Sequence, residues 1–379
     1  MAVAANRPTL SGPRPTSRSL RSGRGHHEPA RPLTTRPSVT VVVPCYRYGH
    51  HLPGAVASAL AQPGVDVDVL VVDDASPDDS AAVAAALAAA DPRVRVVAHE
   101  VNQGHIATFN DGLARATGDY VVLLSADDLL TPGSLGRAAA LLEAHPEVGL
   151  AYGHPREFTD TPPVAGTSVR DWTIWDGHDW LARRCQRGSN CIFCPEVVMR
   201  RSVREAVGGY NPALPHAGDL EMWLRAATVA DVGRVNGADQ AYYRIHDQSM
   251  QRTVYAGLLR DLEERRAAFA SVLLGGDRPV PDGDALYRGA CRALAATALD
   301  RVCWAYDAGA TDDEPITEYL AFACEVDPAV LGSARWRAAE HRRTRGPDRT
   351  AHGVAVRGRL VTRDLSQRIR WRRWRRSGV

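Results

Sequence analysis

The chain has 379 residues, of which 45% are hydrophobic, and its formal net charge is +2. It is long enough to bury one large core or two moderate ones, as expected for a soluble globular protein of one or two domains. All 46 basic residues are arginine, which excludes every mechanism that depends on a lysine amine.

The charges are unevenly distributed along the chain. Residues 1–37 contain seven Arg and one Glu, residues 335–379 contain 15 Arg and three acidic residues, and 38–334 therefore carry a net charge of −16. The acidic body offers neither an aromatic platform for single strands nor a groove-reading motif, so we expect no nucleic-acid partner.

The cysteines and the hydropathy of the chain indicate the cellular compartment of the protein and whether it spans a membrane. The seven cysteines are odd in number and scattered, and the sequence lacks the basic, apolar and small-residue pattern of a leader. This favours a reduced, cytoplasmic protein. The longest apolar stretches fall short of the roughly 18–20 residues that a bilayer span requires, so no transmembrane helix is predicted.

The first 37 residues are rich in Pro, Arg, Ser, Thr and Gly and poor in bulky apolar groups. Such a segment cannot offset its ordering entropy by burial, and a disordered basic arm is predicted over 1–37. The pattern then changes to β-branched runs that alternate with helical spacing. It predicts strands at 38–46, 66–76, 93–100 and 119–128, and helices at 51–62, 78–90 and 105–117.

Strands that alternate with helices of this length predict right-handed crossovers and an α/β fold with a mostly parallel, twisted sheet and flanking helices. Further along, Thr131 is expected to cap a helix whose first residue is Pro132. Residues 155–198 have the weak periodicity of a long functional loop.

The C-terminal part differs from the body. Amphipathic helical patterns recur near 255–273, 284–307 and 315–326. We expect a sheet domain over 38–252, a helical extension over 253–334 and a basic amphipathic tail over 335–379.

Two pairs of adjacent carboxylates, Asp73-Asp74 and Asp127-Asp128, end predicted strands. The crossovers bring these strand ends to one edge of the sheet, where ligands bind in such folds. Asp73 and Asp74 alone fit a turn equally well. Four carboxylates at one cleft would repel strongly, however, unless a cation or hydrogen-bond donors compensated them. Because Mg²⁺ and Mn²⁺ prefer carboxylate and phosphate oxygens, the pattern predicts a divalent cation bound with a phosphorylated ligand.

Four motifs in this order and spacing resemble the family 2 glycosyltransferases with the GT-A (Rossmann-like) fold, over roughly residues 38–250. They are VVVPCYRYGHHLPGAVASALAQ, VVDDAS, NQGHIATFNDGLARATGDYVVLLSADDLLTPGSL and GGYNPALPHAGDLEMWLRAA. The resemblance implies inverting transfer of a hexosyl or N-acetylhexosaminyl group from a nucleotide-diphosphate donor, commonly a UDP-sugar, to a hydroxyl acceptor, with Mn²⁺ or Mg²⁺. The acceptor stays open among a glycan, a lipid-linked glycan and a small metabolite.

The resemblance also implies roles for individual residues. Matching positions for nucleotide binding are Pro44, Tyr46, Asp74, Asn102, Gly104 and Asp127. The matching metal ligands are Asp127, Asp128 and His246, although His246 fits a phosphate contact or a buried histidine equally well.

Asp219 matches the catalytic base of the family, and the alternative is a structural residue at a helix N-terminus. The chain departs from the family at two positions: Gly218 stands where Glu is usual before the base, and Ser125 stands where the acidic motif usually begins with Asp. A degenerate, noncatalytic nucleotide-sugar-binding module is therefore the alternative function.

Cys191 and Cys194 have metal-like spacing but no second pair, which favours packed or reduced thiols over zinc. Residues 363–376 form a basic amphipathic pattern that favours transient contact with an anionic membrane, at the inner face for a cytoplasmic protein; a solvated tail is the alternative. A phospho-accepting receiver domain is excluded because it needs a lysine, and the loop after the first strand is a poor match to a nucleotidyltransferase.

Overall fold

The computed structural model describes residues 25–247, 257–275 and 278–346, and six positions beyond them: Val361, Leu365, Arg368, Ile369, Arg372 and Trp374. The expected membrane-contacting segment 363–376 therefore lies mostly outside the described residues. Among the described residues, no helix has both the length and the apolar character that crossing a bilayer requires.

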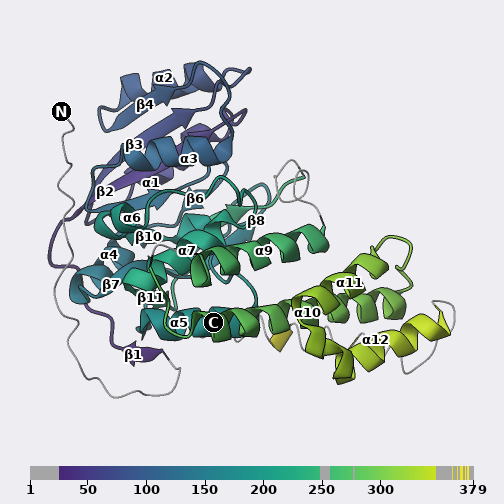
Figure 1. Ribbon diagram of the computed structural model, residues 1–379. Coiled ribbons are helices and arrows are strands. Elements are labelled where there is room, and N and C mark those ends of the chain that lie inside the picture. Colours follow the sequence, from purple (N-terminus) through teal and green to yellow (C-terminus); the bar gives the residue numbers. More distant parts are fainter. Residues whose placement is uncertain are drawn as a thin grey trace, which may run out of the picture.

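Nine strands form the main sheet (Figure 1). Across the sheet they are β1 (His26–Glu28), β9 (Asp171–Trp175), β11 (Asp231–Asn236), β7 (Val148–Tyr152), β10 (Val198–Arg200), β5 (Tyr120–Leu123), β2 (Ser38–Cys45), β3 (Asp66–Asp73) and β4 (Val94–Ala98). Strands β4, β3, β2 and β5 are parallel neighbours, as the alternation predicts. The other half is mixed, because β10 is antiparallel to β5 and β7, and β9 is antiparallel to β11.

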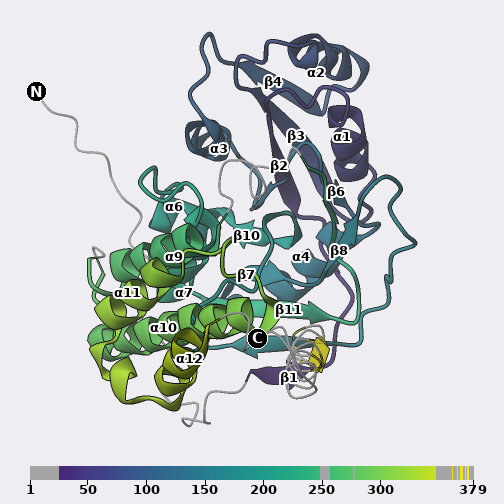
Figure 2. The same cartoon turned by 90° about the vertical axis from the view of Figure 1, so that its right-hand side faces the viewer.

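Strand β2 is buried on both faces, which explains its continuous run of β-branched residues. Val41 and Val43 belong to the core on one face, and Val42 belongs to the core on the other. Helix α1 (Leu52–Leu60) covers the first face and α3 (His105–Ala114) covers the second (Figure 2). Helix α2 (Ser80–Ala90) packs beside β4.

A second, three-stranded sheet is formed by β6 (Leu129–Leu130), β12 (Ala241–Arg244) and β8 (Pro155–Phe158). It lies next to the carboxyl end of β5 because β6 follows that strand after only five residues. The remaining helices of this part are α4 (Ser134–Ala144), α5 (Gly177–Arg187), the short 3-10 helix η1 (Cys194–Glu196), α6 (Arg201–Val207) and α7 (Gly218–Val229).

The C-terminal part is helical, as the amphipathic patterns predict. It contains α9 (Leu258–Leu273), α10 (Gly283–Ala308), α11 (Ile316–Val326), the short 3-10 helix η2 (Pro328–Gly332) and α12 (Ala334–Arg345). Figure 1 shows α10 to α12 extending away from the sheet, while α10 also packs against α5 and α9. The ion pair between Arg342 and Asp307, at 3.0 Å, fastens α12 to α10.

Several expectations need correction. The predicted disorder does not extend over residues 25–37, because β1 pairs with β9 and Glu28 contacts His145 at 3.2 Å; residues 1–24 lie outside the described residues. The expected basic amphipathic tail over 335–379 begins within helix α12, and most of its remainder lies outside the described residues. Residues 155–198 are not one long loop, since they contain β8, β9, α5 and η1.

The predicted cap of α4 is also wrong. The helix begins at Ser134 after Gly133, and no side chain caps it. The buried Thr131 hydroxyl instead donates a hydrogen bond to the carbonyl oxygen of Asp239, at 2.5 Å. Local capping propensity is therefore overridden by a tertiary contact that the sequence pattern does not show.

Candidate active site

The first acidic pair lies at the carboxyl end of β3, where Asp74 is held by the loop before α3. The Asp74 carboxylate accepts hydrogen bonds from the backbone N–H groups of Gln103 (2.8 Å) and Gly104 (2.9 Å). The Asn102 side chain donates to the Asp74 carbonyl oxygen at 3.2 Å. Gly104 has a φ of +86°, a left-handed conformation that favours glycine. Three of the predicted nucleotide-binding residues therefore meet at one strand end.

His99 completes this cluster and was not predicted. Its Nδ1 lies 2.8 Å from an Asp74 carboxylate oxygen, and its Nε2 lies 3.4 Å from Asp111. Burial alone would raise the pKa of Asp74, but the Gln103 amide, His99 and the Gly104 amide outweigh it and hold that pKa below its ordinary value. Burial would lower the pKa of His99, but its two carboxylate partners raise it.

The other carboxylate of this pair, Asp73, ends β3 opposite Cys45 of β2. One of its oxygens accepts a hydrogen bond from the Ser76 backbone N–H at 3.1 Å. The second oxygen is buried and has no hydrogen-bond partner among the described residues. The turn interpretation therefore holds for Asp73 in part, because its carboxylate does close a turn with Ser76.

The chain after β2 forms the adjoining wall. Pro44 pairs with Val72 at the end of the strand. Tyr46 is 42% exposed, so its ring is accessible to a ligand. The Ser76 and Ser80 side chains accept hydrogen bonds from the backbone N–H groups of Arg47 and Gly49. The loops after β2 and β3 are thus joined, and the predicted Pro44 and Tyr46 lie beside the Asp74 cluster.

The second acidic pair follows β5. An Asp127 carboxylate oxygen lies 2.9 Å from Nε2 of His246, although 118 residues separate them in the sequence. Asp128 is 2% exposed and accepts a hydrogen bond from the Arg244 backbone N–H at 2.8 Å. The Arg244 side chain in turn donates to the Asp127 carbonyl oxygen at 2.9 Å. Strand β12 and the residues directly after it therefore contact both carboxylates, and Arg244 is a further site residue that was not predicted.

Electrostatics at this pair favours a cation. Burial, and then the charge of Asp127, raise the pKa of Asp128 well above its ordinary value. Burial, and then the charges of Asp127 and Asp128, raise the pKa of Tyr48 to about 12. The Tyr48 ring packs edge-on against His246, with centroids 5.7 Å apart. A divalent cation would compensate two carboxylates in such a setting.

The residues fit a divalent cation only in part. Asp127 and His246 supply an oxygen and a nitrogen ligand next to each other, whereas Asp128 is buried and accepts a hydrogen bond from the Arg244 backbone. Among the described residues, no three His, Cys, Asp or Glu side chains form a complete cation site. The remaining positions would have to come from phosphate oxygens or water, which is common for Mg²⁺.

The expected base, Asp219, is the second residue of α7 and is partly exposed. Its carboxylate accepts a hydrogen bond from the Tyr210 hydroxyl at 2.9 Å. Burial raises the pKa of Asp219, and the Tyr210 hydrogen bond offsets only part of this rise. No side chain caps α7, so Asp219 is not its N-cap.

Asn110 of helix α3 holds the backbone of Tyr210 in place. The Asn110 side chain donates to the Tyr210 carbonyl oxygen at 2.9 Å and accepts from the Tyr210 N–H at 2.6 Å. A Cβ atom at Gly209 would lie 2.4 Å from the Asn110 amide oxygen, so this close approach requires glycine. The GGY motif thus places the hydroxyl that orients Asp219.

Two residues connect Asp219 to the second acidic pair. Burial raises the pKa of Tyr243, and Asp128, Asp127 and Asp219 add to the rise. Burial likewise raises the pKa of Cys194, with further contributions from Asp219 and Asp128. The charges of Asp127, Asp128 and Asp219 thus all affect the pKa of Tyr243, and those of Asp128 and Asp219 also affect the pKa of Cys194. Cys191 and Cys194 are free thiols, in agreement with the packing interpretation.

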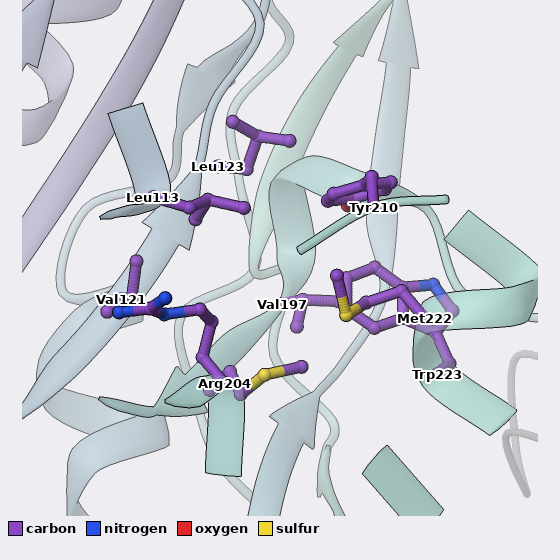
Figure 3. Close-up of a pocket in the computed structure, with 9 residues that line it drawn as sticks. Leu113, Val121, Leu123, Val197, Arg204, Tyr210, Met222 and Trp223 are labelled. Atoms are coloured by element: carbon purple, nitrogen blue, oxygen red, sulfur yellow. The ribbon is translucent and has the colours of Figure 1, made fainter. Parts of the chain in front are cut away.

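The Tyr210 ring also lines a small cavity with other, mainly apolar side chains (Figure 3). The labelled residues around it are Leu113, Val121, Leu123, Val197, Arg204, Met222 and Trp223. None of these lining residues is a carboxylate, so the cavity is not the expected cation site.

Comparison with known proteins agrees with this geometry. The family model described as Glycosyl transferase family 2 matches residues 40–207. The putative glycosyltransferase EpsE of Bacillus subtilis is 31% identical over 221 residues, which cover 57% of this chain and 76% of EpsE. The chain belongs to glycosyltransferase family 2.

Two solved structures show that this family 2 chain has the GT-A fold. TarS of S. aureus in complex with UDP-GlcNAc is 16% identical, with a TM-score of 0.55 over 83% of this chain and 89% of that chain. The mannosyltransferase PcManGT from Pyrobaculum calidifontis in complex with GDP-Man and Mn²⁺ is 20% identical, with a TM-score of 0.51 over 84% and 90%. This chain spans between 21% and 65% of the length of four other curated relatives.

Proposed function

We propose that this family 2 chain transfers a sugar from a nucleoside diphosphate donor to a hydroxyl group of an acceptor, with inversion at the anomeric carbon. The observation that carries the proposal is the Asp219 carboxylate. It is partly exposed and hydrogen-bonded to Tyr210, and together with Asp127 and Asp128 it raises the pKa of Tyr243. An inverting displacement needs a base on the face of the sugar opposite the leaving group, and a carboxylate with a raised pKa suits that role.

In this mechanism Asp219 accepts the proton of the acceptor hydroxyl. The acceptor oxygen forms a bond to the anomeric carbon while the bond from that carbon to the β-phosphate oxygen breaks. The electron pair of the broken bond leaves with the nucleoside diphosphate, and Asp219 releases its proton to solvent. The Tyr210 hydroxyl donates to Asp219 and so orients the carboxylate before the reaction.

Asp127 and His246 would hold a divalent cation, Mn²⁺ or Mg²⁺, together with diphosphate oxygens. When bound, such a cation neutralises the charge that develops on the departing phosphate. Asp128 supports this site by accepting a hydrogen bond from the Arg244 backbone N–H. Ser125 stands where relatives commonly have Asp, so the chain lacks one carboxylate of the usual acidic motif. The affinity for Mn²⁺ and Mg²⁺ should therefore be measured directly.

The nucleoside would bind beside the first acidic pair. The exposed ring of Tyr46 and the adjacent Pro44 provide an apolar surface for a base, and Asp74 fixes the loop at residues 102–104. A uridine nucleotide is the proposed donor, supported by the UDP-GlcNAc complex of TarS. GDP-mannose is the necessary comparison because PcManGT was crystallised with it.

We propose that the protein acts in the cytoplasm. There the basic segment 363–376 would contact an anionic membrane surface. The composition of that segment supports this proposal. Binding of the full chain to vesicles with and without phosphatidylglycerol, compared with a chain in which the Arg residues of 363–376 are replaced by Gln, tests it.

The central test uses two matched aspartates. Asp219→Asn should slow sugar transfer by a factor of about 10²–10⁴, the usual contribution of a general base, while nucleotide affinity measured by titration calorimetry changes little. Asp179→Asn is the control, because Asp179 also lies in the first turn of a helix, is partly exposed and has a pKa raised by burial. It should leave transfer unchanged.

Donor hydrolysis without acceptor defines the substrate class. UDP-, GDP- and dTDP-sugars are incubated with the full chain and Mn²⁺, and release of the nucleoside diphosphate is measured with and without EDTA. Release from a UDP-sugar that EDTA abolishes supports the proposal. Tight nucleotide binding without turnover of any donor, or full activity of Asp219→Asn, contradicts it.

A further inference from the structure

Three partly exposed aromatic side chains form a continuous row. The rings of Tyr243 and Phe193 lie 5.1 Å apart between centroids, and those of Phe193 and Trp374 lie 6.2 Å apart. All three side chains retain exposed area. Aromatic side chains that serve only as core are usually buried, as Trp172 and Trp180 are in this chain, so a partly exposed row is unusual.

The inner end of the row adjoins the proposed reaction centre. Tyr243 directly precedes Arg244, whose backbone N–H donates to Asp128. Phe193 directly precedes Cys194, whose sulfur lies 3.8 Å from the hydroxyl of Tyr210. Because Tyr210 donates to Asp219, both Tyr243 and Phe193 adjoin residues that contact the proposed site.

The outer end of the row is supplied by the C-terminal region. The Trp374 indole Nε1–H donates a hydrogen bond to the Cys191 carbonyl oxygen at 2.9 Å, and its ring packs on His154 with centroids 5.2 Å apart. The hydrogen bond holds the indole by one edge, and the residue is partly exposed. A residue 131 positions beyond Tyr243 thus extends a surface that begins at the reaction centre.

The chemistry of this surface suits carbohydrate. Pyranose rings present apolar C–H faces that stack on aromatic rings, and their hydroxyl groups need hydrogen-bond partners at the rim. The Tyr243 hydroxyl and the exposed Glu157 carboxylate lie within electrostatic reach of each other and can supply such partners. A purely apolar chain would leave these groups without partners.

We propose that Tyr243, Phe193 and Trp374 form an acceptor-binding shelf that stacks against consecutive sugar rings of an oligosaccharide, with Trp374 selecting acceptors of two or more rings. This proposal rests on the proposed function, because it names the acceptor class of the same site. Trp374 is a specificity-determining residue in this scheme, and it takes no part in the chemical step.

The test compares four full-length chains: wild type, Trp374→Phe, Trp374→Leu and Trp374→Ala. Each is labelled and applied, with UDP and Mn²⁺, to an array of immobilised mono- to tetrasaccharides that also carries undecaprenyl phosphate. Wild type should retain oligosaccharides in preference to monosaccharides. Trp374→Phe should stay within about threefold of wild type, whereas Trp374→Leu and Trp374→Ala should lose about tenfold, because stacking needs an aromatic face.

Donor hydrolysis without acceptor separates failure of the shelf from failure of the proposed function. It should be the same in all four chains. If hydrolysis is normal but wild type retains no oligosaccharide, or Trp374→Ala retains as much as wild type, the shelf is wrong and the transferase proposal stands. If no chain hydrolyses any donor, the proposed function itself fails.

Two further outcomes would overturn the shelf in a specific way. Faster donor hydrolysis or stronger oligosaccharide retention by Trp374→Ala would show that the indole occupies the acceptor site and blocks it. Retention of undecaprenyl phosphate in preference to every oligosaccharide would show that the row binds a lipid chain. Thermal unfolding checks that each variant is folded. Trp374→Phe is the control that keeps an aromatic ring at this position.

Discussion

The two acidic pairs have the same sequence, Asp-Asp after a buried strand, and opposite environments. At the end of β3, two backbone N–H groups and His99 surround the Asp74 carboxylate, and its pKa is lowered. After β5, Asp128 is buried with one backbone N–H from Arg244, and its pKa is raised. The protein therefore stabilises the charged form of Asp74 and destabilises the charged form of Asp128.

The difference supports the proposal that the second pair is the one that takes part in chemistry. A carboxylate with sufficient donors is a structural anchor, because removing it leaves backbone groups unpaired. A carboxylate pair short of donors favours a cation, and strained electrostatics of this kind is common at functional sites. The sequence motif alone does not distinguish the two, since the loops that supply the donors come from elsewhere in the chain.

The largest expected effect is at the second pair. Asp127→Asn should slow transfer by about 100-fold or more, because a metal contributes several kcal/mol to the transition state and each 1.36 kcal/mol is about tenfold in rate. Transfer rates measured over a range of Mn²⁺ concentrations check this, and added Mn²⁺ should not restore the rate. Asp79→Asn, at an exposed position whose side chain makes no cap hydrogen bond, is the control. An Asp127→Asn enzyme with a wild-type rate would remove the cation from the mechanism.

An intermediate effect is expected at the first pair, on stability. Asp74→Asn should lower the free energy of unfolding at pH 7 by about 1–3 kcal/mol, because the amide turns an N–H group toward the backbone donors of Gln103 and Gly104. Urea unfolding measures this change.

The pH dependence of that loss has a defined sign. Because the pKa of Asp74 is lowered on folding, its stabilising contribution is present above the unfolded value of about 3.9 and disappears as the pH falls through the folded value. The difference between wild type and Asp74→Asn should therefore shrink in acid. Equal stability of the two proteins at pH 7 would contradict the anchoring role.

The smallest effect is expected at Asp128, with the opposite sign. The pKa of Asp128 is raised on folding, so wild type loses stability as the pH rises above about 3.9 toward the folded value. Asp128→Asn removes this loss and keeps an oxygen for the Arg244 N–H, so it should be slightly more stable than wild type at pH 7. Urea midpoints between pH 4 and 8 test the prediction. A less stable variant, or a difference that does not change with pH, would refute it.

Sequence patterns located the parallel half of the sheet well. The run at 38–46 became β2, and the alternation correctly predicted β3, β4 and β5 as parallel strands of the same sheet. Burial on two faces leaves a strong signal in a single strand, because nearly every residue must be apolar. The same reasoning failed for 155–198, whose strands pair with distant partners and whose helix α5 is polar on its outer side.

Residues of the candidate site were predicted where a sequence motif lies at the end of a strand. They were missed where the hydrogen-bond partner comes from a distant segment without a motif. Asp74, Asn102 and Gly104 meet as expected, and so do Asp127 and His246. His99 was missed because an isolated histidine after a strand has no distinctive pattern. The Thr131 cap was wrong because a long-range bond to residue 239 competes with the local one.

By itself the sequence determined the parallel strands around β2, the carboxylates at their ends and the family to which the chain belongs, because buried strands and short motifs are local patterns. Only the tertiary structure decided the surroundings of each carboxylate, since hydrogen-bond donors and burial come from segments far apart in the chain. Asp74 meets Gln103 and Gly104, Asp127 meets His246, and Asp219 meets Tyr210. The pKa of a carboxyl group depends on these neighbours, and no spacing rule specifies them.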